Sequence, residues 1–170
     1  MTYTEEYNAQ LAALIAATKS ITDVGRVHDR PRHGDFRERW VAKIDGLEQI
    51  RSWEIAPEQV EVIRREQGRR HRYRTWAIRG VVGLSDMALE DEPQNPPADE
   101  STDASFHVAQ RLAGEIADAV DVAREAHVAA GTFIDHEPTQ ISEPQVVTIG
   151  GGALCWGITL TLTGYTVITP

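Results

Sequence analysis

The chain has 170 residues, 41% of them hydrophobic and 25% charged, and carries a formal net charge of −9 at pH 7. This acidic balance argues against general binding to nucleic acids or anionic membranes. Residues 1–79 hold fifteen basic residues against twelve carboxylates, whereas residues 80–170 hold two against fourteen. Such a division suits head-to-tail packing of identical subunits better than it suits a catalytic pocket.

Residues 4–19 have the spacing of an amphipathic helix. Leu11, Leu14 and Ile15 recur at steps of three and four residues through an alanine-rich run. Thr4 is a residue type that commonly caps the start of a helix. The sequence therefore predicts that the fold begins with a helix over this segment.

An irregular loop and a second, short helix are expected next. Residues 25–34 are strongly charged, and Pro31 and Gly34 disfavour regular structure there. In residues 36–44 the apolar side chains share one helical face, and Gly46 ends that segment. The pattern predicts a loop followed by a helix of about two turns.

From Arg51 onward, apolar residues alternate with polar ones, which is typical of β-strands. The alternation is broken at Ile63 and resumes in residues 73–82. We expect two long antiparallel strands joined by a hairpin turn at residues 67–70. This hairpin would place six arginines at and beside one tip. They are Arg64, Arg65, Arg69, Arg70, Arg72 and Arg74.

The second half begins with an acidic segment. Residues 86–103 are too polar and too rich in proline to pack, so we expect an exposed acidic loop. A broad apolar stripe then predicts a long helix that begins near Ser101 or Asp103 and ends at Gly131. This helix carries the strongest helical pattern of the chain.

Two further strands are predicted in residues 146–149 and 154–162. The order is then helix, short helix, two strands, long helix and two strands. We therefore predict a single α+β domain over residues 1–170, with a mainly antiparallel sheet of about four strands and helices packed on one face.

Glycines 150–152 could indicate a phosphate-binding loop, and the histidines could indicate a metal site. The glycine run precedes an apolar strand and no helix follows it, so a hairpin turn or bulge explains it better than phosphate binding. Two loops contain possible metal ligands, but neither has the spacing of a known metal motif, and solvated polar loops explain both. We predict no cofactor and no metal. The two loop groups are His28, Asp29 and His33, and Asp135, His136 and Glu137.

Catalytic and targeting motifs were not found either. Cys155 is the only cysteine, so no internal disulfide can form, and its apolar neighbours predict a buried thiol with no redox role. The sequence contains no Gly-x-Ser-x-Gly element and no identifiable acid–base pair. It also shows no signal-peptide pattern and no run of eighteen apolar residues. These features favour a non-enzymatic protein that neither spans a membrane nor leaves the cell by a standard signal.

The arginine hairpin has three interpretations. Its guanidinium groups suit carboxylates on a neighbouring subunit, or phosphates on DNA with Tyr73 and Trp76 as partly apolar supports. Alternatively, it is a solvated strand face balanced by Glu61 and Glu66.

One segment of the sequence carries a resemblance. Val24-Gly25-Arg26-Val27-His28-Asp29 precedes an arginine-containing turn, a Trp-bearing segment at 36–44 and a strand centred on Trp53. This layout resembles the tail-terminator or tail-completion family, a group of minor tail proteins of long-tailed bacteriophages in which a G-x-V-H-(D/N) element follows the first helix. The resemblance extends to the order of helices and strands over most of the chain.

The resemblance implies a structural virion protein that forms a ring, commonly of six subunits, at the end of the tail tube. It implies contacts with the tail tube protein and with a neck or connector protein, transient contact with DNA in the lumen, and assembly in the bacterial host cytoplasm. It transfers no catalytic residue, although His28 and Asp29 match its motif. Candidate contact residues under this hypothesis are Arg26, His28, Arg30, Arg64, Arg65, Arg69, Arg70, Arg72 and Arg74.

Two other classes of function compete with this one. A nucleic-acid-binding module would use the arginine hairpin and would show salt-dependent DNA binding. A metal-dependent hydrolase would use His28 and Asp29 with His33 or His136, and would retain stoichiometric metal through purification. Another head–tail joining protein would share the size and the lack of catalytic motifs of a terminator.

Overall fold

The computed structural model describes residues 2–30, 40–44, 46–66, 69–84, 104–129, 134–135, 137–149 and 152–168. Within this part of the chain, two helices and eight strands form an α+β fold. The helices are α1 (Tyr3–Lys19) and α3 (Ala104–Ala129). The strands are β1 (Arg26–His28), β2 (Val41–Ile44), β3 (Leu47–Glu66), β4 (Arg69–Gly83), β5 (Ile134–Asp135), β6 (Gln140–Ile141), β7 (Gln145–Ile149) and β8 (Ala153–Ile168).

Three long strands make the centre of the sheet. β4 lies between β3 and β8 and is antiparallel to both. β1 pairs in parallel with β3, and β2 pairs antiparallel with the start of β3. β4 occupies one edge of β8 along almost the whole length of β8. The short strands β7, β6 and β5 pair in succession with the other edge of β8. The sheet is therefore mixed but mostly antiparallel.

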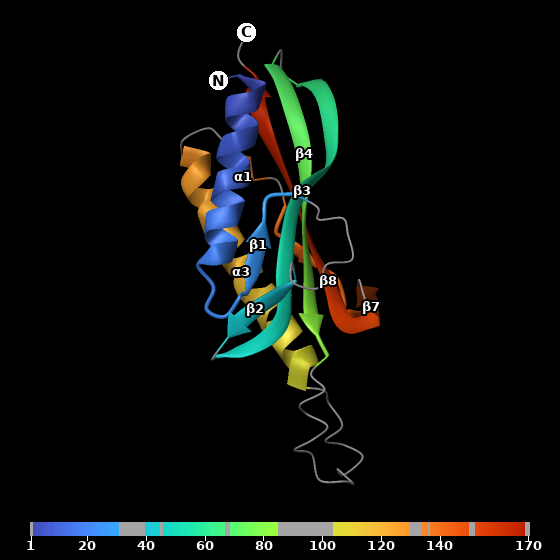
Figure 1. Cartoon of the computed structure of the whole chain (residues 1–170). Coiled ribbons are helices and arrows are strands. Elements are labelled where there is room, and N and C mark those ends of the chain that lie inside the picture. Colours follow the sequence, from blue (N-terminus) through green and yellow to red (C-terminus); the bar gives the residue numbers. More distant parts are fainter. Residues whose placement is uncertain are drawn as a thin grey trace, which may run out of the picture.

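Both helices pack against the same face of the sheet and against each other (Figure 1). The core between them is made by apolar side chains at alternate positions of the long strands, which is the period that a half-buried strand requires. Trp53, Trp76, Ile78 and Leu160 are fully buried there. The start of α1 and the end of β8 lie at the same end of the molecule (Figure 1).

The first helix is confirmed, with a different cap from the one expected. Thr2, not Thr4, caps α1: its hydroxyl accepts from the backbone N–H of Glu5, and the Glu5 carboxylate accepts from the backbone N–H of Thr2 at 2.7 Å. A threonine followed three residues later by a glutamate satisfies two backbone donors at once. The capping bonds lower the pKa of the Glu5 carboxyl.

The predicted short helix over residues 36–44 is wrong for its last four residues, which form the strand β2. Val41–Ile44 pairs with the beginning of β3, with Ile44 opposite Leu47. The two intervening residues are Asp-Gly, a dipeptide favoured in tight hairpin turns, and Gly46 has a φ of +81°. Gly46 therefore belongs to a hairpin turn and does not end a helix. Residues 36–39 lie outside the described part.

The expected loop after α1 also contains a strand. Arg26–His28 forms β1, where Val27 packs against the core and pairs with Trp53. Gly25 has a φ of +88°, and a side chain there would overlap the Arg51 carbonyl, so the close approach of the two segments requires glycine. The number of strands was underestimated, because β1, β2, β5 and β6 have only two to four residues each.

The long strands and the long helix are confirmed. The interruption expected at Ile63 coincides with an irregularity in the pairing of β3 between Val62 and Arg64. The acidic segment 86–103 lies outside the described residues. The helix α3 begins directly after it, at Ala104. Neither described helix is long and apolar enough to cross a membrane.

Candidate functional site

The backbone register at the end of the β3–β4 hairpin brings basic residue types opposite one another. Arg65 pairs with Arg70, and Arg64 pairs with His71. Glu66 pairs with Arg69, so the last pair of the hairpin joins opposite charges. Like charges directly opposite on neighbouring strands destabilise a sheet. The register therefore places two arginines directly opposite each other near the hairpin end.

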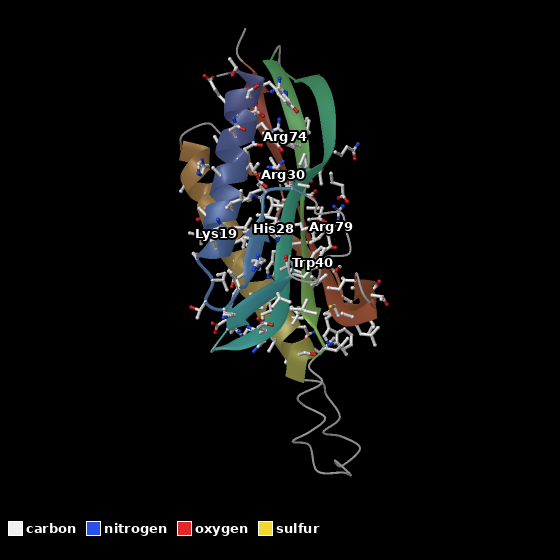
Figure 2. All side chains as sticks on the ribbon, viewed as in Figure 1. Lys19, His28, Arg30, Trp40, Arg74 and Arg79 are labelled. Atoms are coloured by element: carbon white, nitrogen blue, oxygen red, sulfur yellow. The ribbon has the colours of Figure 1, made fainter. Side chains whose placement is uncertain are left out.

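Arg72 and Arg74, nearer the core, form ion pairs with α1. Arg72 Nη1 donates to Glu6 Oε2 at 2.8 Å. Arg74 Nη1 donates to Gln10 Oε1 at 2.8 Å and lies 3.6 Å from Glu6 Oε1. Figure 2 shows Arg74 at the contact between α1 and the strands, where its side chain is only 2% exposed. We call Glu6, Gln10, Arg72 and Arg74 the α1–β4 polar cluster.

Aromatic rings surround the two guanidinium groups of this cluster. The Arg74 Cζ atom lies 5.0 Å from the Tyr3 ring centroid, 5.3 Å from that of Tyr7 and 5.7 Å from that of Trp76. The Arg72 Cζ atom lies 4.6 Å from the Tyr3 centroid. These distances are within the range of cation–π attraction, which strengthens where the cation is desolvated.

Gln10 connects the cluster to the rest of the sheet. Its Oε1 atom also accepts a hydrogen bond from Trp76 Nε1 at 3.3 Å, and its Nε2 donates to Thr166 Oγ1 at 3.2 Å. One glutamine side chain thus joins α1, β4 and β8. The cluster fixes the position of α1 on the long strands.

These contacts change the interpretation of two predicted contact residues. Arg74 is removed from the candidate set, because a buried guanidinium between α1 and β4 cannot meet a partner in this conformation. The Arg72 side chain is 19% exposed and already paired with Glu6. The hairpin positions that stay candidates for partner contact are Arg64, Arg65, Arg69 and Arg70.

The other predicted contact residues lie in a separate group at β1. Arg26 donates from Nε to the Val41 carbonyl and so connects β1 to β2. Arg30 pairs with the adjacent Asp29, and both side chains are largely exposed. His28 pairs in register with Glu54 of β3, ten positions before Arg64. At the rise of a β-strand, this group lies roughly 30 Å along β3 from the hairpin end, so the nine predicted residues do not form one surface.

The weaker site hypotheses receive no support from the described residues. No group of three metal-ligating side chains occurs among them, although His33 and His136 lie outside this part of the chain. Gly152 belongs to the connection between β7 and β8, whose residues Ile149 and Ala153 pair directly, as a hairpin requires. The Cys155 side chain is buried as predicted, and burial raises the pKa of its thiol to about 11.

Sequence reasoning missed a second buried arginine. Arg124 of α3 has a 1% exposed side chain, and its Nη2 donates to the carbonyl oxygens of Glu137 at 2.8 Å and Thr163 at 3.1 Å. Its Nη1 bonds to Asp121 at 3.0 Å, and Asp121 in turn accepts from the Thr139 hydroxyl at 2.7 Å. These bonds connect α3 to β8 and to the segment before β6. A signal was present, because Arg124 continues the apolar stripe of α3 four residues after Val120.

Comparison with protein-family models and with characterised proteins gives no match for this chain.

Proposed function

We propose that this protein is a structural assembly subunit that uses the end of the β3–β4 hairpin to contact acidic groups of a neighbouring molecule. The observation that carries the proposal is the register that sets Arg65 opposite Arg70 and Arg64 opposite His71. Arginine presents two parallel N–H groups that match a carboxylate, so such contacts are stronger than those of a simple point charge. A neighbouring carboxylate would relieve the repulsion between Arg65 and Arg70, which carry like charges at opposed positions.

The chain itself offers acidic groups in its second half. Residues 80–170 carry fourteen carboxylates and two arginines, whereas the hairpin end belongs to the basic first half. If the basic part of one subunit meets the acidic part of the next, the contact is heterologous and generates a closed ring or an open filament. A homo-oligomeric ring is the closed solution.

Within this class, we propose a tail terminator or tail-completion subunit that forms a ring, commonly of six copies, between the tail tube and the neck. Support for this finer assignment comes from the resemblance of the Gly25–Asp29 element and from the order of the long elements, in which a first helix, two long strands, a second helix and a final long strand follow one another. The subunit would contact the tail tube protein and a connector protein, and its site of action would be the virion tail.

The test is the absolute mass in solution by light scattering after size exclusion, over a range of protein and salt concentrations. We expect a hexamer-sized species that dissociates as salt rises, because salt screens exposed charge pairs. The variant Arg65→Glu with Arg70→Glu should be monomeric. The control is Lys43→Glu with Arg79→Glu, which makes the same charge change at exposed positions of β2 and β4 and should retain the assembly.

Two results would contradict this proposal. One is a wild-type protein that stays monomeric at every concentration and salt, including in the presence of tail tube protein. The other is equal loss of assembly in the hairpin variant and in the control, which would show a dependence on net charge and not on the hairpin.

The same hairpin end supports a second candidate, a nucleic-acid-binding module, because rows of arginine also match phosphate groups. This candidate predicts salt-dependent DNA binding that is lost in the variant Arg69→Glu with Arg70→Glu. A DNA titration at low salt separates the two functions. Absence of binding there would leave the assembly role.

A further inference from the structure

The α1–β4 polar cluster contains buried polar atoms that its direct contacts do not satisfy. Arg74 Nε, Arg74 Nη2 and Glu6 Oε1 are inaccessible to solvent and have no hydrogen-bonding partner among the protein groups that the structure describes. Arg74 Nη1 is 3.6 Å from Glu6 Oε1, which is an ion-pair distance but too long for a hydrogen bond. About 90% or more of buried polar groups in folded proteins are hydrogen-bonded, so three such atoms at one contact point to a bound group.

The chemistry of the three atoms restricts what that group can be. The two nitrogens of Arg74 are donors and need an acceptor, whereas the carboxylate oxygen of Glu6 is an acceptor and needs a donor. A simple anion would accept from Arg74 but would leave Glu6 Oε1 without a donor and would repel its charge. Water supplies both an acceptor and donors, and buried waters typically make about three hydrogen bonds of this kind.

We propose that an ordered water molecule, held by Arg74 and Glu6, is a constant part of the contact between α1 and β4. This site is independent of the proposed assembly function. Its position has a structural consequence, because Arg72 and Arg74 lie on the same strand as Arg69 and Arg70. The hydrated cluster therefore attaches the base of the basic hairpin to α1.

The test uses the Arg74 side-chain N–H as the probe. In 15N-labelled wild-type protein, the Arg74 Hε proton should show a cross-peak to water whose sign matches that of cross-peaks within the protein, which identifies a long-lived bound water. The variant Arg74→Met should lose this cross-peak together with the probe, so a second probe is the Trp76 Nε1–H, which donates to Gln10 Oε1. The Trp76 Nε1–H resonance should persist in Arg74→Met with a changed chemical shift, because Arg74 Nη1 donates to the same Gln10 oxygen, and its persistence shows that the variant is folded.

The matched control is Arg79→Met, on the same strand, where the arginine is 47% exposed and paired with Glu58. It should leave the water cross-peaks of Arg74 unchanged. If Arg74→Met does not fold, the wild-type spectrum and a crystal structure of the wild-type protein still decide the question. In the crystal we expect a water within hydrogen-bonding distance of Arg74 Nε or Nη2 and of Glu6 Oε1.

Three outcomes would overturn the inference. They are an Arg74 Hε proton that contacts only protein protons, one that exchanges only with bulk solvent, and a bromide peak at this position in crystals soaked with bromide. The last result would assign the site to an anion.

Discussion

A single methyl group at Gly80 should disrupt the largest side chain of the core. Gly80 of β4 pairs directly with Trp53 of β3, and a Cβ atom built at Gly80 would lie 2.2–2.6 Å from three carbons of the Trp53 ring. The ring is fully buried, and its Nε1 donates to the Val24 carbonyl at 3.0 Å. The ring therefore cannot move away without losing this bond. Overpacking costs about 1–3 kcal/mol, and an unsatisfied buried N–H adds about 1–3 kcal/mol, so we expect Gly80→Ala to destabilise the protein by roughly 2–6 kcal/mol.

Equilibrium unfolding in urea, followed by tryptophan fluorescence and by circular dichroism, measures this effect. The control is Gly114→Ala in α3, where the added methyl group meets no atom within 4 Å. It should stabilise the protein by about 0.5–1 kcal/mol, because alanine loses less backbone freedom than glycine in a helix. A free energy of unfolding for Gly80→Ala within about 0.5 kcal/mol of the wild-type value would contradict this prediction, because surface substitutions without structural effect usually fall in that range.

Two buried side chains, Arg124 and Cys155, give further predictions. Arg124→Met should destabilise by about 2–4 kcal/mol in urea unfolding, because it leaves two carbonyls without their donor. Arg111→Met, at an exposed pair on the same helix, should change stability by less than about 0.5 kcal/mol. Since the pKa of the Cys155 thiol is raised from 9.0 to about 11, the unfolded chain releases this proton first between these pH values, so stability should fall there as pH rises. The fall should be smaller in Cys155→Ala, and native Cys155 should resist alkylation at pH 8 until urea is added.

The long elements could be predicted because each repeats its pattern many times. α3 and the three long strands have at least fifteen residues each, and the pattern extends over much of each element, so one exception does not hide it. The segment 41–44 is too short for its pattern to separate a helix from a strand. Apolar residues at 41 and 44 fit one face of a helix, and they also fit a strand in which one residue is out of phase. The Asp-Gly dipeptide after Ile44 was the stronger signal, and it predicts the hairpin that the structure contains.

The buried arginine of β4 could also have been predicted. Arg74 has the same alternation as Trp76 and Ile78, both of which are fully buried. On α1, Glu6 and Gln10 precede the buried Leu14 at steps of four residues and so lie on its inner face. A polar side chain in line with core residues on each of two elements indicates a buried polar contact between them. Which two elements meet could not be known, because the pairing depends on the tertiary arrangement.

This distinction decides how the assembly hypothesis should be tested. Charge reversal at Arg74 would place a second carboxylate beside Glu6 in the interior, with only Arg72 left to neutralise the two, and an uncompensated buried charge would cost several kcal/mol. Such a variant would lose assembly because it unfolds, and the result would be mistaken for an interface effect. Arg65 and Arg70 are opposite each other in the backbone register, beyond the α1–β4 polar cluster, so their reversal removes the opposed positive charges and leaves the residues of that cluster unchanged. Assembly would be attributed to the hairpin only if the variant Arg65→Glu with Arg70→Glu has a lower molar mass in solution than the wild type and still shows cooperative unfolding in urea.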